Sequence, residues 1–115
     1  MDLIGHPALA ELHPAPRTHV ERPERLRVLH QGFAGIGAGR PATRDQIERV
    51  HEPAYVQGIE ALTTEVMLDP DTYAGPTTWE AAMLAAGCAI EAVERQGFAL
   101  VRPPGHHALP GAAMG

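Results

Sequence analysis

The sequence predicts a layered α/β fold, and two observations support this prediction. A long amphipathic helix is expected over residues 77–96, and one glycine later the chain enters the apolar run Phe98-Ala99-Leu100-Val101. A short apolar run without alternation is typical of a strand that is covered on both faces, and a helix leading directly into such a strand is the pattern of α/β proteins. The 12 glycines and 11 prolines further indicate that much of the chain forms turns and loops.

The first part of the chain is expected to be a loop followed by one helix. Residues 1–22 contain three prolines and show no regular period beyond the pair Leu3-Ile4, which leaves room for a short first strand. Pro23 suits the first turn of a helix, and apolar residues then recur at helical spacing. We therefore expect a helix of about 23–34, ended by a glycine-rich link.

The middle of the chain alternates short elements with turns. Thr43 and Gln46 have the spacing of a capping box, which predicts one short helical turn, and residues 47–51 are then expected to form a brief strand. Pro53 begins a second helix that runs through Leu62. Residues 69–76 are dense in turn-forming residues and are expected to be an ordered surface loop.

The helix over 77–96 is the strongest local prediction. Thr77 and Glu80 have capping-box spacing, and Gly97 is expected to close the helix as its C′ residue. Small residues along the helix would allow a neighbouring segment to approach closely. The residues expected on its apolar face are Trp79, Met83, Ala86, Ile90 and Val93.

Composition excludes several classes of function. The net charge of −5 and the lack of a dense Lys/Arg cluster argue against nucleic-acid binding. The first residues do not resemble a secretion signal, and no apolar run is long enough to span a membrane. Cys88, as the single cysteine, cannot form an internal disulfide, so a reducing compartment is expected and the cytoplasm is the predicted location.

Two adjacent histidines carry the clearest chemical signal. His106 and His107 follow Arg102-Pro103-Pro104-Gly105, at the carboxyl end of the predicted strand 98–101. Open parallel sheets bind ligands beyond the carboxyl ends of their strands, and a histidine pair there could accept a proton from a water nucleophile and return it to a leaving amine. A solvated histidine pair on an ordinary Pro-Pro-Gly turn is the alternative. Adjacent side chains rarely chelate one ion together, so no metal ligands are assigned.

Four strings in this order resemble the zinc-dependent histone deacetylase family, which includes acetylpolyamine amidohydrolases and acetoin-utilisation relatives. The most characteristic string is RPPGHHA at 102–108. The others are HVERPERL at 19–26, VHEPAYV at 50–56 and DPDT at 69–72. Together they span residues 19–108.

The resemblance implies an arginase-like α/β fold with a central parallel sheet, and hydrolysis of an acetylated amine with zinc as cofactor. It implies that His107 acts as general base and then acid, with His106 as its electrostatic partner. Asp71 corresponds to a rim carboxylate that holds the substrate, and Arg25 to a basic residue lining an internal cavity. From the residues alone, a turn cap for Asp71 and a solvated helix charge for Arg25 remain the alternatives.

The chain departs from the family pattern in what it lacks. The Asp and His residues that hold zinc in family members follow the histidine pair, and none can be assigned before Gly115. Leu109 also stands where an acidic residue is common. We therefore expect residues 1–115 to be the N-terminal part of a single deacetylase-like domain, truncated before the metal ligands and inactive alone. A non-catalytic binding or regulatory module is the alternative.

Overall fold

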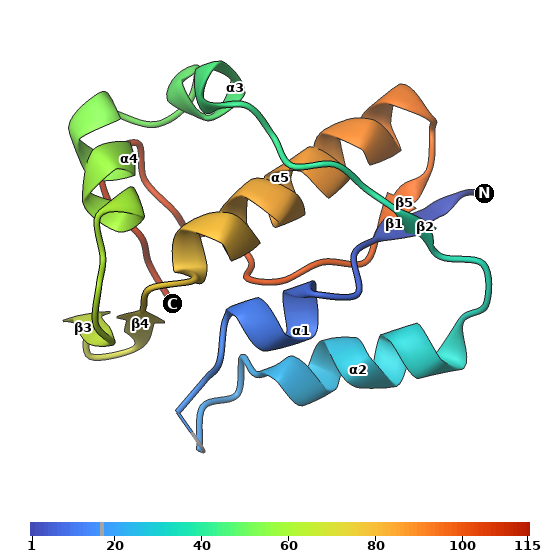
Figure 1. Ribbon diagram of the computed structural model, residues 1–115, viewed down its shortest axis with the longest axis horizontal. Helices are drawn as coiled ribbons and strands as arrows, with labels where there is room; N and C mark the ends of the chain where they lie inside the picture. The colour runs from blue at the N-terminus through green and yellow to red at the C-terminus, as the bar shows by residue number, and fades with distance from the viewer. Residues whose placement is uncertain (17) are drawn as a thin grey trace.

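The computed structural model describes residues 1–16 and 18–115, and it confirms an α/β fold (Figure 1). The sheet at one end of the molecule is surrounded by helices, and a separate hairpin lies at the other end. The helices are α1 (Leu9–Leu12), α2 (Pro23–Gly32), α3 (Arg44–Glu48), α4 (Pro53–Glu60) and α5 (Thr78–Glu94). The strands are β1 (Leu3–Gly5), β2 (Gly37–Ala38), β3 (Val66–Asp69), β4 (Thr72–Ala74) and β5 (Phe98–Ala99).

The main sheet is parallel and has the order β2-β1-β5. Ile4 of the central strand β1 pairs with Gly37 on one side and Ala99 on the other, and its side chain is completely buried. The expected strand 98–101 is confirmed only in part, because β5 has two residues and Phe98 is 55% exposed. Leu100 continues the pairing, with its N–H donating to the Ile4 carbonyl at 2.8 Å, before the chain leaves the sheet.

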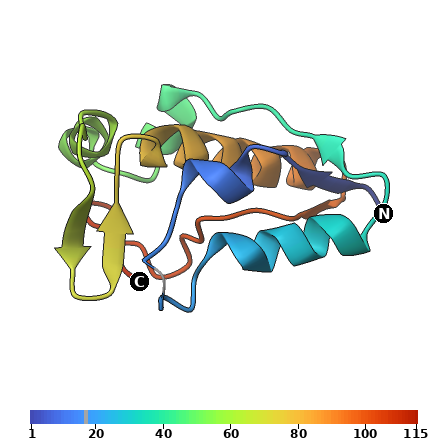
Figure 2. The same ribbon diagram turned by 60° about the horizontal axis from the view of Figure 1, so that its bottom comes forward.

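Helices on both sides of the sheet close the core. Figure 2 shows α5 above the sheet and α2 below it, with the chain after β5 running between them. α2 contributes Leu26, which is 2% exposed, and α5 contributes several small and medium-sized residues. The buried core cluster consists of Ile4, Leu9, Leu26, Leu84, Ala85, Cys88, Ala92 and Leu100.

A glycine in α5 allows the chain after β2 to cross this helix at close range, as expected from its small residues. A Cβ at Gly87 would overlap the carbonyl oxygen of Arg40, and it would lie 2.5 Å from the backbone nitrogen of Ala42. The Ala42 N–H donates to the Met83 carbonyl of α5 at 2.8 Å. The crossing segment is therefore hydrogen-bonded directly to the helix backbone, and a larger residue at position 87 would push it away.

The two ends of α5 differ from the sequence prediction. Thr77 occupies the N-cap position, but its side chain makes no capping hydrogen bond and instead donates to the Leu12 carbonyl of α1. The left-handed C′ residue is Gln96, with φ of 53°, and not Gly97. Gly97 is the next residue: its N–H donates to the Ala92 carbonyl at 2.7 Å, and a Cβ there would lie 2.5 Å from the Asp2 carbonyl oxygen. The close approach to β1 therefore explains the glycine.

The buried face of α5 agrees with the predicted one only in part: Met83 is buried as expected. Val93, expected on the apolar face, is 80% exposed, and Trp79 and Ile90 are only partly buried. The helix is apolar around most of its circumference, so its sequence does not indicate which stripe meets the sheet. The stripe that does so runs through Leu84, Cys88 and Ala92.

The predicted strand over 47–51 is wrong. Ile47 and Glu48 lie in α3, whose capping box between Thr43 and Gln46 is present as expected. The helical pattern of hydrogen bonds then continues, because the His51 N–H donates to the Ile47 carbonyl at 3.0 Å. These bonds occupy the backbone groups that a strand would need. The sequence also gave no indication of α1 or β2.

The loop predicted over 69–76 contains the turn of an antiparallel hairpin, but it also includes the end of β3 and the whole of β4, so the loop prediction is wrong over 72–74. Met67 pairs with Tyr73, and the register shifts between Met67 and Asp69. The carboxylate of Asp69 accepts the Asp71 N–H at 2.8 Å and the Thr72 hydroxyl at 2.7 Å, which closes the turn. The turn was predicted, whereas its two short flanking strands were missed.

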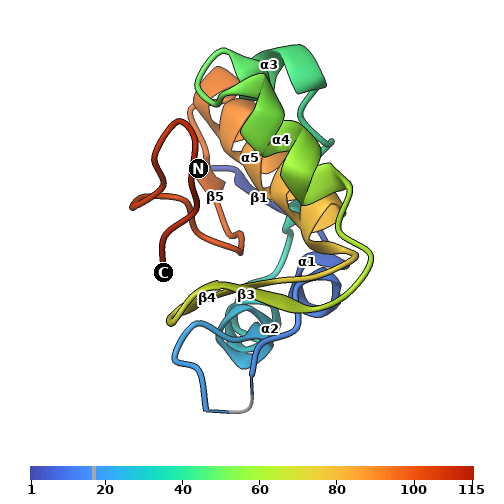
Figure 3. The ribbon, with the colours of Figure 1, turned by 90° about the vertical axis from the view of Figure 1, so that its left-hand side faces the viewer.

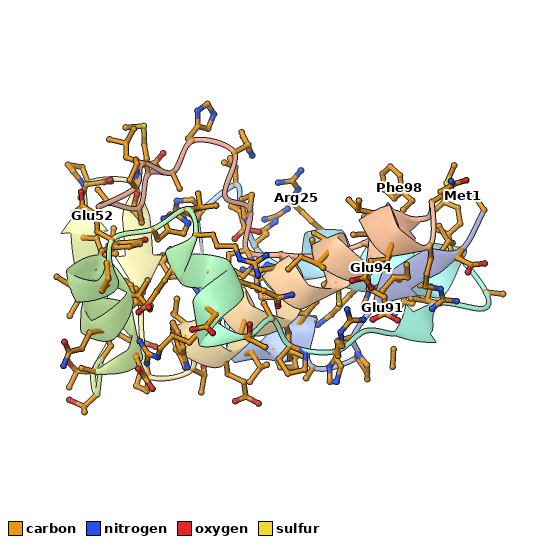
Figure 4. The ribbon with its side chains drawn as sticks, turned by 90° about the horizontal axis from the view of Figure 1, so that it is seen from above. Met1, Arg25, Glu52, Glu91, Glu94 and Phe98 are labelled. Atoms are coloured by element: carbon orange, nitrogen blue, oxygen red, sulfur yellow. The ribbon has the colours of Figure 1, made fainter. Side chains whose placement is uncertain are left out.

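Surface ion pairs connect α5 and the residue that follows it to the segments next to β2 and β1. Glu91 and Glu94 of α5 face the chain after β2 (Figure 4), where both pair with Arg40 at 3.3 and 2.8 Å. Arg95 pairs with Asp2 before β1 at 2.7 Å. Among the helices of residues 1–16 and 18–115, none is long and apolar enough to cross a membrane.

We predict opposite effects from alanine at two helical glycines. Gly87→Ala is expected to destabilise the chain by about 1–3 kcal/mol or more, because the new methyl group overlaps a backbone segment that cannot move freely. Gly58→Ala in α4 is the control. Its Cβ meets nothing within 4 Å, so the better helix propensity should stabilise by up to about 1 kcal/mol. Urea unfolding of both variants tests this, and equal effects would contradict the close crossing.

Candidate functional site

The two histidines lie side by side on a tight turn beyond β5. The centroids of the His106 and His107 rings are 4.3 Å apart with an interplanar angle of 53°. Adjacent side chains diverge in extended backbone, but here the backbone turns, and the Ala108 N–H donates to the Gly105 carbonyl at 3.0 Å. Both rings are exposed, and within the described part of the chain neither has a hydrogen-bond partner. They are therefore open to solvent.

A buried arginine anchors the start of this turn. Arg102 is 3% exposed, and its guanidinium makes a two-point contact with the Glu21 carboxylate at 3.0 and 2.8 Å. It also donates to the Tyr73 hydroxyl at 2.9 Å and to the Ala10 carbonyl of α1 at 3.3 Å. Arg102 thus joins the turn to α1, to the segment before α2 and to the hairpin.

The Glu21 carboxylate stays ionised beside Arg102 although it is buried. Burial alone would raise the pKa of Glu21, but the hydrogen bond and charge of Arg102 outweigh it and bring the pKa below its ordinary value. The Tyr73 hydroxyl donates to Glu21 at 3.2 Å. Burial raises the pKa of Tyr73 to about 12, so this hydroxyl keeps its proton at neutral pH.

His13 completes the buried cluster. Its ring stacks on Tyr73 with centroids 4.4 Å apart. Thr78 Oγ1 accepts the Gly75 N–H at 2.8 Å and lies 3.0 Å from His13 Nδ1, within hydrogen-bond distance. Burial, followed by the charge of Arg102, lowers the pKa of His13 to about 4. The ring is therefore neutral at pH 7.

The rim carboxylate predicted from the sequence lies on the tip of the β3–β4 hairpin, which projects from the body of the molecule (Figure 3). The Asp71 side chain is 78% exposed. His19 Nε2 lies 2.8 Å from the Asp71 carbonyl oxygen and 3.1 Å from Oδ1 of its carboxylate. His19 is thus a hydrogen-bonding residue, and its partner is the predicted substrate residue.

Arg25 lies apart from these groups. It is exposed on α2, where Figure 4 labels it. Within the described residues, no hydrogen bond or ion pair links Arg25 to His106, His107 or Asp71. The structure thus brings the two histidines together and ties the hairpin of Asp71 to their turn through Tyr73 and Arg102. The roles assigned to the four residues stay predictions.

An open apolar groove of about 360 Å³ lies beside the turn. Trp79, Met83 and Ala86 of α5 form one wall, and Tyr55 of α4 contributes to another. Pro103–Gly105 of the histidine turn borders the groove, as do the last residues of the chain. The groove thus borders part of the α5 face that was expected to be core, where Met83 is buried and Trp79 and Ala86 are partly exposed.

The described residues do not form a metal site. No three His, Cys, Asp or Glu side chains in residues 1–16 and 18–115 lie close enough together to hold a metal ion. The exposed pair His106 and His107 supplies two nitrogen atoms at most in one place, whereas zinc sites in enzymes have three protein ligands. These side chains alone therefore do not fit the zinc ion that the family resemblance implies.

Sequence reasoning assigned no role to Arg102, Glu21, Tyr73 or His13. Two of them carried a usable signal: Glu21 and Arg102 have opposite charges and lie in two of the family-like strings. Their pairing across 81 positions depends on the fold. His13 carried no signal, because nothing in the local sequence distinguishes it from a solvated loop histidine.

The fold and this arrangement define an α/β protein with a histidine pair beyond a parallel strand, and a family model identifies the class. The histone deacetylase domain model matches residues 19–115. The chain therefore belongs to the histone deacetylase family. The match includes all four strings found in the sequence.

Individual relatives agree with this assignment. The chain is 36% identical to histone deacetylase 15 of Arabidopsis thaliana and 35% identical to the histone deacetylase-like amidohydrolase of Pseudomonas aeruginosa. These matches cover 92% and 89% of the chain but only 22% and 31% of the relatives. The polyamine deacetylase HDAC10 of Homo sapiens is 35% identical over 87% of the chain and 18% of its own length.

A solved structure shows the same fold. The crystal structure of the HDA15 HD domain superposes with a TM-score of 0.86 at 28% sequence identity, and the match covers 99% of this chain and 38% of that one. The chain therefore spans less than a third of each of the three relatives named above and under half of the solved domain.

We predict that acid destabilises the chain through His13. Its pKa is about 4 when folded and about 6.5 when unfolded, so the unfolded state binds a proton first as the pH falls. The free energy of unfolding should drop by roughly 2 kcal/mol from pH 7 to pH 5 on account of this residue. Urea unfolding at both pH values checks this. A His13→Gln variant should show a smaller drop, and an unchanged drop would contradict a buried neutral His13.

Proposed function

We propose that residues 1–115 are the N-terminal part of a single deacetylase domain that hydrolyses an acetylated amine. Family membership and the resemblance at RPPGHHA support this proposal. The observation that carries it is the exposed His106–His107 pair on a turn that buried Arg102 anchors. Such a pair is rigidly presented at its base and accessible at its tip, as a proton-transfer site requires.

In this proposal the histidines move protons. Amide hydrolysis requires removal of a proton from the attacking water and delivery of a proton to the leaving amine nitrogen. His107 performs both steps as general base and then general acid, and His106 tunes its charge across the 4.3 Å between the rings. General acid–base catalysis of this kind typically contributes about 10²–10⁴-fold in rate.

Zinc is the cofactor that family membership implies. The described residues do not fit a zinc site, so we infer that the metal-holding side chains lie in polypeptide outside these 115 residues. No step of the proposed mechanism is assigned to the metal on the basis of this chain. The proposed contribution of the chain is the proton-transfer part of the site and part of its rim.

Asp71 and Arg25 are proposed to contact substrate. Asp71 is an exposed acceptor at the hairpin tip and suits an amine or an amide N–H of the substrate. Arg25 is exposed on α2 in the described residues, and the family resemblance supports the proposal that it lines an internal cavity of the complete domain. The substrate is an acetylated amine, such as an acetyl-lysine, an acetylpolyamine or a small amide. Two of the relatives are named for histone and polyamine deacetylation.

A non-catalytic binding or regulatory module is the second candidate. Two observations favour it: the described residues contain no metal cluster, and the apolar groove beside α5 is open. In this case a partner would cover the groove, and His106 and His107 would have no catalytic role.

Zinc content and turnover of the purified chain test the proposal. We expect no stoichiometric zinc after dialysis and no hydrolysis of acetyl-lysine peptide or acetylpolyamine by the 115 residues alone. Joined to the remaining part of the Pseudomonas aeruginosa amidohydrolase, the chain should give turnover that falls at least about 10²-fold in His107→Asn. His6→Asn, in a histidine outside the site, should keep activity.

Three outcomes separate the candidates. Stoichiometric zinc and His107-dependent turnover in the chain alone would contradict the proposed division of the site. Turnover of the joined protein that does not depend on His107 would contradict its assigned role. A folded joined protein that binds zinc without any turnover would favour the binding module.

A further inference from the structure

We propose that His19 is a positioning residue that holds Asp71 in place for the substrate. This inference rests on the proposed function, because Asp71 is the residue assigned to hold the acetylated amine. The two residues come from separate family-like strings, HVERPERL and DPDT, and lie 52 positions apart. The fold places them within hydrogen-bond distance at the hairpin tip.

Both ring nitrogens of His19 are used, and this fixes how the ring is protonated. The Glu21 N–H donates to Nδ1 at 3.1 Å, so in the neutral ring the proton sits on Nε2. Nε2 then donates to the Asp71 carbonyl oxygen at 2.8 Å and lies 3.1 Å from Oδ1 of the Asp71 carboxylate. Nε2 also carries a proton in the charged ring, so the contact with Asp71 persists in both states.

The surroundings of His19 restrain its ring. The ring meets Tyr73 edge-on, with centroids 5.3 Å apart and an interplanar angle of 73°. Tyr73 is itself held by its stack on His13 and by hydrogen bonds with Glu21 and Arg102. The His19 side chain is 11% exposed, against 78% for Asp71. A restrained, largely buried group thus holds an exposed one.

The hairpin turn alone leaves the Asp71 carboxylate without a fixed direction. Asp69 closes the turn through the Asp71 N–H and the Thr72 hydroxyl, and neither bond involves the carboxylate of Asp71. His19 makes the contact that reaches both the carbonyl and the carboxylate of Asp71. Losing it should let the carboxylate sample more orientations and weaken substrate binding more than the chemical step.

Two variants separate positioning of Asp71 from support of the local backbone. In His19→Asn, the side-chain oxygen can replace Nδ1 and keep the Glu21 N–H bond, but the shorter side chain cannot reach Asp71. In His19→Gln, the side-chain amide can replace Nε2 and keep the Asp71 bond. A positioning role predicts damage from Asn and rescue by Gln, and a purely local structural role predicts the opposite.

The contact itself is measured by NMR on the 115-residue chain. Titration of the His19 ring should give a lower pKa in Asp71→Asn, because the variant keeps the backbone hydrogen bond that contributes most to raising this pKa but removes the adjacent negative charge that also raises it. Glu21, His13 and Tyr73 also face the ring, and they are unchanged in this variant. A change in the His19 pKa therefore reports the loss of the Asp71 carboxylate. An unchanged His19 pKa would overturn the inference whatever the function of the protein.

The consequence is measured in the complete enzyme joined as above, with an acetyl-lysine peptide as substrate. We expect His19→Asn to raise KM roughly 5- to 10-fold with kcat changed by less than about twofold, and His19→Gln to stay within about twofold of the parent. Asp71→Ala should raise KM similarly, and the double variant His19→Asn with Asp71→Ala should be no worse than Asp71→Ala alone.

These outcomes distinguish the inference from the proposed function. If Asp71→Ala raises KM and His19→Asn does not, the positioning role is overturned and the rim assignment stands. Greater damage from Gln than from Asn also overturns the positioning role. If Asp71→Ala leaves KM unchanged while the enzyme remains active, the rim assignment fails and the inference fails with it.

Discussion

The arrangement of the candidate site depends on one buried ion pair, Arg102 with Glu21. Both side chains are nearly inaccessible, at 3% and 11% exposure. An unpaired charge at this depth would destabilise the fold, so the buried Arg102 and the buried Glu21 each need the other as an ion-pair partner. Arg102 follows the edge strand β5, and Glu21 precedes α2. The pair therefore fixes two distant parts of the chain to each other, and Tyr73 brings the β3–β4 hairpin to the same point.

This cluster explains how exposed candidate groups are held in place. The histidine turn and the hairpin tip lie at the surface, exposed to solvent, and each is attached to the cluster at its base. Arg102 precedes the turn that carries His106 and His107, and Tyr73 follows Asp71 by two residues. His13 covers the other face of Tyr73 and remains neutral there, because burial and the charge of Arg102 oppose its protonation.

The sequence predicted the elements that are governed by local chemistry and missed those governed by contacts over long distances. The Thr43 capping box and the long helix that became α5 were predicted because their signals lie within one or two turns. The strand β2 has two residues, too few for any period to show, and the apolar run predicted as a strand over 98–101 forms only the two-residue β5. The apolar face of α5 was only partly assigned correctly, because the helix is apolar on most sides. Likewise, RPPGHHA indicated the histidine pair, but only the fold reveals that Arg102 meets Glu21 and that His19 meets Asp71.

The central claim is that Arg102 and Glu21 act as one unit, and a double-mutant cycle tests it most directly. Urea unfolding of the chain is compared for Arg102→Met, Glu21→Gln and the double variant. Arg102→Met, which leaves an unpaired buried charge, is expected to cost about 3–5 kcal/mol. The double variant should be less destabilised than the two single effects predict together, by about 1–3 kcal/mol. Additive effects, or a loss below about 1 kcal/mol for Arg102→Met, would contradict the account.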